Sequence, residues 1–182
     1  MNNLIIICCI LIILIILIIY YAIINSSNGY NTCNNNNINC VSNNQCNFLK
    51  NSLNNIDQLS KNISTTPIKQ IIQQQTSNYN LANYVTQLSA HAETLKTNAQ
   101  NMAQSGMAII TNAENEGALN PTLIENVKSS AGQLSSSFST LSTDIQNLAS
   151  QTASNPQIQS ALITLSNSLN SVANASGTTA SI

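Results

Sequence analysis

Two long segments of this chain repeat apolar or small residues in alternating steps of four and three. One segment runs from Leu81 to Ala113 and the other from Ile124 to Thr152. Shorter segments with the same spacing run from Leu49 to Ile63 and from Ile158 to Val172. This spacing places the repeated residues on one stripe of an α-helix, as in the seam between packed helices. The repeat therefore predicts an all-α fold, in which the helices form an antiparallel coiled-coil-like hairpin or bundle.

The three prolines mark where helices begin, because each follows a Thr or Asn that can cap a helix. Gly117 is placed to end the helix before Asn120. The predicted helices span residues 48–64, 67–116 (with a break near Asn78), 121–153 and 156–174. Their outer faces carry Ser, Thr, Asn and Gln, which are mediocre helix formers, so the helices depend on packing. A disordered chain is the alternative, but it does not explain unbroken heptads.

The lengths of the helices also predict how they pack. Helices 48–64 and 156–174 are short, and both are expected to cover the end away from Gly117. The tip near Gly117 is then a bare two-helix hairpin. A turn centred near Asn120 pairs residue i with residue 240 − i, which places Gly106 opposite Leu134. In that register a Gly106→Leu change overpacks the seam.

An uncharged apolar run precedes the helical part, from Leu4 to Ile24. As a helix its 21 residues would be about 31 Å long, close to the thickness of a bilayer's hydrocarbon core. No basic residue precedes the run, and Tyr20 and Tyr21 lie where aromatic rings favour the membrane interface. We therefore expect residues 1–24 to form a transmembrane signal-anchor. A signal peptide cleaved after Ser26 is the alternative.

The rest of the chain divides by composition. Residues 25–47 are rich in Asn and lack a helical period, so they are interpreted as a flexible neck. Residues 48–176 are expected to form the helical bundle, and residues 177–182 a disordered tail. The downstream cysteines favour placing the bundle on the extracytoplasmic side of the membrane.

The neck contains three cysteines, at Cys33, Cys40 and Cys46. In an oxidising compartment an odd number allows one bridge and one thiol that is free or joins a second chain. The spacing does not resemble that of a zinc site, which needs about four ligands. We expect candidate disulfides among these residues, and a homo-oligomer held by a neck cysteine or by the helical seams.

Two kinds of covalent modification are also suggested. The sequon for N-glycosylation occurs at Asn25, Asn62 and Asn174. Cys8 and Cys9 lie inside the apolar run, where thiols can be palmitoylated, although Cys is also simply a small hydrophobic residue.

The chain offers little for catalysis. Charged residues make up 6% of it, Arg is absent and the net charge is −1, so nucleic acid is not an expected partner. Glu114 and Glu116 are two residues apart and do not share a helix face, and His91 is the single histidine. No nucleophile motif or phosphate-binding loop is present. We therefore predict no catalytic, cofactor-binding or metal-binding residue, and a protein that is not an enzyme.

These features favour a membrane-anchored structural or interaction protein whose bundle serves spacing, adhesion or homotypic assembly. The membrane is then its expected partner. One alternative is a membrane-remodelling or fusion-type protein. It would use the apolar residues around the hairpin tip, which are Ile109, Ile110, Leu119, Leu123 and Ile124. Another alternative is a secreted helical carrier released by signal cleavage.

Overall fold

The computed structural model describes residues 43–75, 79–115 and 121–182, and 92% of these residues are helical, with no strand among them. The helices are α2 (Asn43–Lys61), α3 (Thr66–Gln75), α4 (Tyr79–Asn115), α5 (Pro121–Gln151) and α6 (Pro156–Ala180). The prediction of an all-α fold is therefore confirmed. The predicted anchor over residues 1–24 and most of the predicted neck lie outside the described residues.

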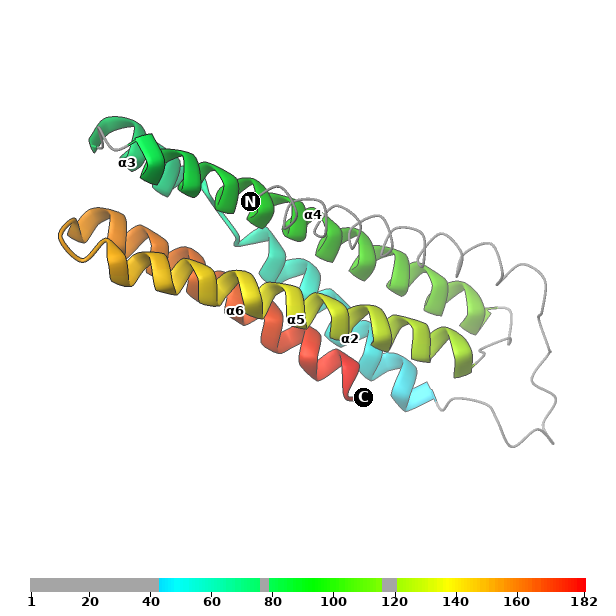
Figure 1. Ribbon diagram of the computed structural model, residues 1–182. Helices are drawn as coiled ribbons and strands as arrows, with labels where there is room; N and C mark the ends of the chain where they lie inside the picture. The colour runs from blue at the N-terminus through cyan, green and yellow to red at the C-terminus, as the bar shows by residue number, and fades with distance from the viewer. Residues whose placement is uncertain (1–42, 76–78, 116–120) are drawn as a thin grey trace.

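The helices form a bundle in which each one is antiparallel to its neighbours (Figure 1). α2 packs against α4 and α6, and α5 packs against the same two helices from the other side. α3 continues the direction of α2 after a short break and contacts α4 and α6. α2 and α3 together therefore act as the first arm of an up-down-up-down four-helix bundle.

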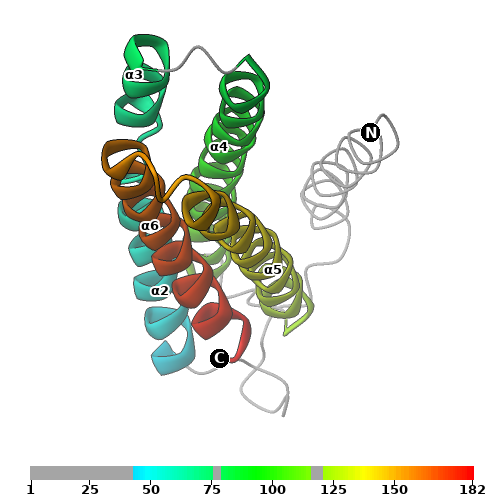
Figure 2. The same cartoon turned by 60° about the vertical axis from the view of Figure 1, so that its left-hand side comes forward.

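The short helices do not both cover the end that was predicted. Lys50 of α2 is bonded to Glu114 of α4, so α2 lies beside the last turns of α4, at the end where α5 begins. The prediction of a bare two-helix tip is wrong. α3 ends at Gln75 and α4 begins at Tyr79, which agrees with the predicted break near Asn78, but the packing prediction treated residues 67–116 as one straight helix. α3 and α4 lie side by side, so α3 belongs to the first arm, and α2 is left to cover the tip (Figure 2).

The predicted seams form the core with few exceptions. Every seam residue of α5 is buried, from Ile124 to Thr152, and so is every predicted seam residue of α6. In α4 the seam shifts by one residue near its end, where Ile110 is 1% exposed and Ile109 is only partly buried. The largest enclosed side chain is Phe138, at the middle of α5. The sequence pattern therefore identified the core residues.

The register between α4 and α5 differs from the predicted one. A Cβ atom on Gly106 would lie 3.6 Å from Val127 and 3.0 Å from Leu53 of α2. Val127 is one heptad before Leu134, the predicted neighbour, so this pairing is wrong. The prediction considered two helices alone. In the folded chain α2 fills the space over Gly106, and the α4–α5 pair adopts a register that accommodates it.

Both ends of the described bundle extend beyond the predicted helices. α2 begins at Asn43, five residues before the predicted start, and its first turns bury Cys46 and Leu49 completely. α6 continues to Ala180 through the segment predicted to be a disordered tail. Thr179 is fully buried there, because Ala, Ser and Gly residues let α6 lie close to α5. Tertiary contacts therefore extend helices that local preference alone would end earlier.

Candidate functional site

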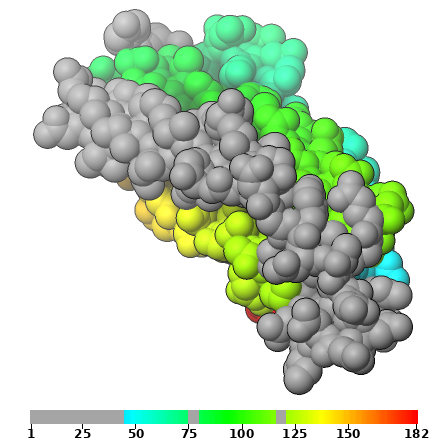
Figure 3. Space-filling view, turned by 90° about the vertical axis from the view of Figure 1, so that its right-hand side faces the viewer, coloured from blue at the N-terminus to red at the C-terminus, as the bar shows by residue number. Residues whose placement is uncertain are grey.

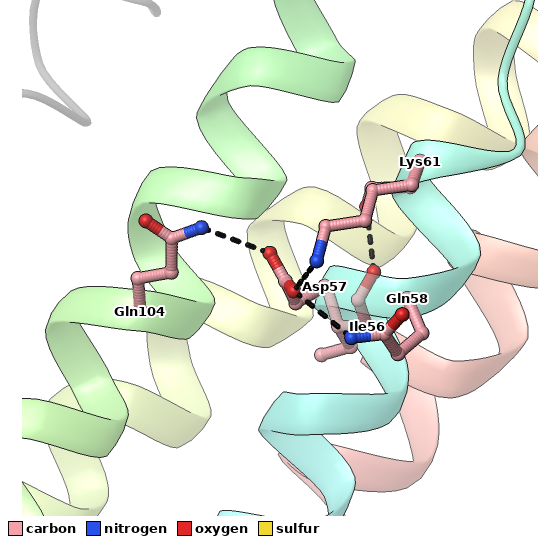
Figure 4. Close-up of polar contacts among 6 residues, drawn as sticks. Ile56, Asp57, Gln58, Lys61 and Gln104 are labelled. Carbon is pink, nitrogen blue, oxygen red and sulfur yellow. Dashed lines mark hydrogen bonds and ion pairs between the residues drawn. The ribbon is translucent and has the colours of Figure 1, made fainter.

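A buried carboxylate, Asp57, lies between α2 and α4 (Figure 4). Lys61 Nζ lies 2.6 Å from its Oδ2 atom, and Gln104 Nε2 of α4 donates to its Oδ1 atom at 3.1 Å. The hydrogen bond from Lys61 lowers the pKa of Asp57, burial opposes this, and the bond from Gln104 adds to the lowering. Both carboxylate oxygens thus accept a hydrogen bond, one from the same helix and one from α4, so Asp57 braces these two helices.

Further polar contacts tie the first arm to α4. Lys50 Nζ lies 2.6 Å from Glu114 Oε2 near one end of the bundle. At the break between α2 and α3, Thr65 Oγ1 donates to Glu93 Oε1 at 2.8 Å, and Lys96 Nζ donates to the backbone oxygen of Ile63 at 2.8 Å. These groups satisfy one another across the α2–α4 and α3–α4 boundaries. Two local spacings in the sequence point to this network, Asp57–Lys61 at four residues and Glu93–Lys96 at three, but neither identifies the tertiary partners.

Two further titratable groups of the described residues, His91 and Cys46, have shifted pKa values. His91 of α4 is half-buried, and burial lowers its pKa while the nearby charge of Asp144 on α5 partly offsets the effect. Cys46 is a free and fully buried thiol whose pKa is raised by burial and by the charge of Glu114. In the part of the chain that the structure describes, no three His, Cys, Asp or Glu side chains gather as metal ligands would.

The outer surfaces of α5 and α6 have a different character, because almost no charge lies on them. α6 contains no charged residue, and between residues 129 and 155 the only charged one is Asp144. Each helix exposes a row of small polar side chains in steps of four and three. We call these two rows the hydroxyl face; its residues are Ser129, Gln133, Ser136, Thr140, Thr143, Asn147, Ser150, Ser160, Thr164, Asn167, Ser171, Asn174, Thr178 and Ser181.

Many hydroxyl groups of the hydroxyl face are bonded to their own helix. Thr140 Oγ1 donates to the backbone oxygen of Ser136 at 3.0 Å, and Thr164 Oγ1 donates to that of Ser160 at 2.9 Å. Ser171 and Thr178 make the same bond to the residue four before them. The donor of each hydroxyl is therefore used, while its oxygen can still accept a hydrogen bond from outside.

Beneath this face, α5 and α6 are joined through buried hydroxyl groups. The Oγ atoms of Ser142 and Ser166 lie 2.8 Å apart, and each hydroxyl has one proton, which it can donate to the other hydroxyl or to the other residue's backbone oxygen, at 3.0 and 3.1 Å. Ser135 Oγ donates to the backbone oxygen of Ala173 at 2.8 Å. Small side chains let the two helix backbones approach closely, so α5 and α6 form the most extensive helix pair of the bundle.

The structure places only some of the residues singled out in the sequence. Asn62 is exposed where α2 ends, and Asn174 is exposed on α6. Cys46 lies inside α2 and not in a flexible neck. The disulfide and glycosylation assignments stay predictions. The other candidates, Cys8, Cys9, Asn25, Cys33 and Cys40, lie outside the described residues, as does Glu116.

The helices of the bundle are not membrane spans. Within residues 43–75, 79–115 and 121–182, no helix combines the length and the apolar character needed to cross a bilayer. Comparisons with protein-family models, with curated proteins and with solved structures find no match for this chain.

Proposed function

We propose that this chain is a membrane-anchored structural or interaction protein, whose bundle stands on the extracytoplasmic side and associates with copies of itself through the hydroxyl face. The observation that carries the proposal is the distribution of charge. Among the described residues, the ion pairs lie on α2, on α4 and on the first turns of α5. α6 and most of α5 instead expose rows of uncharged polar side chains.

An uncharged face suits pairing with an identical copy. Two copies related by a two-fold axis bring the same surface together, and like charges on that surface would repel. Here the exposed hydroxyl oxygens accept hydrogen bonds, and the amide groups of Gln133, Asn147 and Asn167 can donate them. The hydroxyl face is therefore self-complementary in hydrogen bonding.

The sequence supports the anchored arrangement. Residues 25–42 separate the apolar run from the start of α2 at Asn43. An anchor at residues 4–24 would attach to the bundle at the end where α2 begins and α4 ends. With α4 about 55 Å long at 1.5 Å per residue, the bundle would act as a spacer of that height.

The fusion-type alternative has less support. Of the apolar residues expected at the hairpin tip, Ile110 and Ile124 are 1% and 8% exposed, so they contribute to the core. Ile109 and Leu123 are partly buried, and Leu119 lies outside the described residues. Phe48 of α2 is 55% exposed near this end, so the apolar surface there is smaller than the sequence suggests but is still present.

The anchored location is tested by alkaline carbonate extraction of membranes that contain the full-length chain, together with N-terminal sequencing. We expect the chain to stay in the pellet with residues 4–24 intact. A soluble chain that begins after Ser26 would show a secreted protein.

Self-association is tested by sedimentation of the full-length chain in detergent. We expect an oligomer that Thr140→Lys combined with Ser171→Lys converts to monomer, because the change places charge on the hydroxyl face. Asn51→Lys combined with Asn55→Lys adds the same charge to exposed positions of α2 and should leave the oligomer intact. A wild-type monomer, or equal loss in both variants, would contradict the proposal.

A further inference from the structure

The break between α2 and α3 alternates exposed and buried side chains. Asn62 and Ser64 are exposed, whereas Ile63 is 0% and Thr65 is 1% exposed. Backbone hydrogen bonds from Asn62 to Leu59 and from Ile63 to Ser60, both 3.1 Å, close the last turn of α2.

The buried residues hold this break in place. Ile63 lies in the core, and Lys96 of α4 donates to its backbone oxygen. Thr65 donates to Glu93 on the same helix. The chain from residue 62 to residue 65 is therefore fixed at two points, with Asn62 and Ser64 left accessible outside the helices.

We infer that Asn62 is an N-glycan acceptor, with the Ser64 hydroxyl as the second element of its recognition. The inference rests on the proposed extracytoplasmic placement. The donor would be an oligosaccharide linked to a lipid diphosphate. The bond between the first sugar carbon and the diphosphate oxygen breaks, and a bond from that carbon to Asn62 Nδ2 forms. The lipid diphosphate leaves with the electron pair of the broken bond, and one amide proton passes to a base of the transferase. Both sequon side chains must be reachable for this transfer, and at this break both are.

The sequon at Asn174 lacks this accessibility. It lies within α6, where the backbone is helical from Pro156 to Ala180. Asn174 is exposed, but Ser176 is 0% exposed and its Oγ atom is enclosed, with no hydrogen-bond partner among the described residues. An enzyme that must engage both side chains cannot reach Ser176 in the folded chain. Of the two sequons in the described residues, the structure thus favours Asn62.

The position of Asn62 is compatible with self-association through the α5 row of the hydroxyl face. Asn62 lies on the first arm, which packs between α4 and α6, whereas α5 is the helix diagonal to α2. A bulky glycan at the break would leave the exposed row of α5 uncovered.

The test uses the full-length chain carrying Asn25→Gln, expressed in a eukaryotic secretory pathway with an added C-terminal acceptor sequon that reports translocation. The readout is the gel mobility before and after treatment with peptide N-glycosidase. We expect two glycans in this chain and in its Asn174→Gln variant. We expect one glycan, that of the reporter, in the Asn62→Gln and Ser64→Ala variants.

The possible outcomes distinguish a failure of the inference alone from a failure of the proposed placement. A modified reporter with no glycan lost in Asn62→Gln overturns the inference and leaves the placement standing. Loss of the second glycan in Asn174→Gln also overturns it. An unmodified reporter, with no glycan at Asn62, overturns the placement and the inference together. Because Asn62 and Ser64 are both exposed, neither substitution removes a core contact.

Discussion

At the scale of single residues, Asp57 connects α2 to α4 through groups that lie far apart in the sequence. A buried carboxylate is costly unless its charge is paired and hydrogen-bonded. Lys61 supplies the charge from the next turn of the same helix, and Gln104 supplies a second donor from α4. The residue therefore fixes how these two helices lie relative to one another.

The Asp57→Asn variant should lower the free energy of unfolding by about 1–3 kcal/mol, since an amide group would direct a donor at Lys61 or Gln104. Glu125→Gln is the matched control, because Glu125 forms an exposed pair with Lys128 and should matter by less than about 0.5 kcal/mol. Urea denaturation at neutral pH measures both.

The same variant tests how the stability contributed by Asp57 depends on pH. The pKa of Asp57 is lowered from 3.8, so its ionised form stabilises the fold above that pH, and this contribution is lost as the pH falls through the lowered pKa. The difference between wild type and Asp57→Asn should therefore shrink in acid. A difference that stays constant from pH 7 to strong acid would argue against an ionised Asp57 in the fold.

His91 should make the bundle less stable below neutral pH. Its pKa is lowered from 6.5 by burial, so the unfolded chain takes up a proton before the folded chain does. Stability is then complete above pH 6.5 and falls as the pH drops from there toward the lowered pKa. His91→Gln should flatten this part of the curve, while Asp144→Asn should steepen it by removing the charge that favours protonated His91.

The pKa of His91 can be measured directly, because it is the single histidine of the chain. Its NMR titration in the folded protein should give a midpoint below 6.5, and lower still in Asp144→Asn. A midpoint above 6.5 would reverse the sign and refute the account.

At the scale of helices, glycine has opposite roles at two positions. Gly106 of α4 faces Leu53, which is fully buried, and a Cβ atom there would lie 3.0 Å from Leu53 Cδ1. Gly132 of α5 faces Ala180 across the α5–α6 boundary, and a Cβ atom would lie at 3.6 Å, an ordinary contact. Close packing against Leu53 therefore requires glycine at position 106, whereas position 132 has room for the methyl group of alanine.

Gly106→Leu should therefore destabilise the fold by about 1–3 kcal/mol through overpacking. Gly132→Ala should stabilise it by about 0.5–1 kcal/mol, since alanine favours helix and meets no clash. Thermal and urea unfolding of the two variants measure the contrast. Unchanged stability in Gly106→Leu, or a loss in Gly132→Ala, would show that the packing differs from this structure.

At the scale of the whole molecule, the bundle is unevenly braced. α5 and α6 pack against one another along most of their length, whereas α3 has ten residues and follows a break in the first arm. Figure 3 shows α3, in teal, against the green surface of α4 at one end of the bundle. Its buried apolar anchors are Ile68 and Ile72.

Amide hydrogens of α3 should accordingly exchange faster than those in the middle of α5 and α6, because fewer buried contacts oppose local opening. The last turns of α4 should be protected, since α2 covers them. Hydrogen exchange read by mass spectrometry compares these segments in one experiment. Slow exchange in α3 together with fast exchange in residues 103–114 of α4 would instead support the bare two-helix tip that was predicted from the sequence.

The sequence by itself determined most of the buried stripes and where three of the helices begin, but it did not identify Cys46, Ile68 or Ile72 as core residues. Spacing in steps of four and three identifies a buried stripe, and this holds from Ile124 to Thr152 without exception. Asn155 caps α6 by accepting from the backbone nitrogen of Ile158, as a residue before Pro156 can. α5 begins at Pro121, and α3 begins at Thr66, one residue before Pro67.

Only the tertiary structure decided which buried stripe packs against which, and in which register. A heptad repeat is unchanged by a shift of seven residues, so Val127 and Leu134 are equivalent neighbours for Gly106 until a third helix selects between them. The predicted seams end at Ile63 and resume at Leu81, so the pattern allows a break near Asn78 but cannot assign α3 to the first arm. The two rows of the hydroxyl face divide in the same way: each row is encoded within its own helix, whereas the pairing of α5 with α6 is decided by tertiary packing.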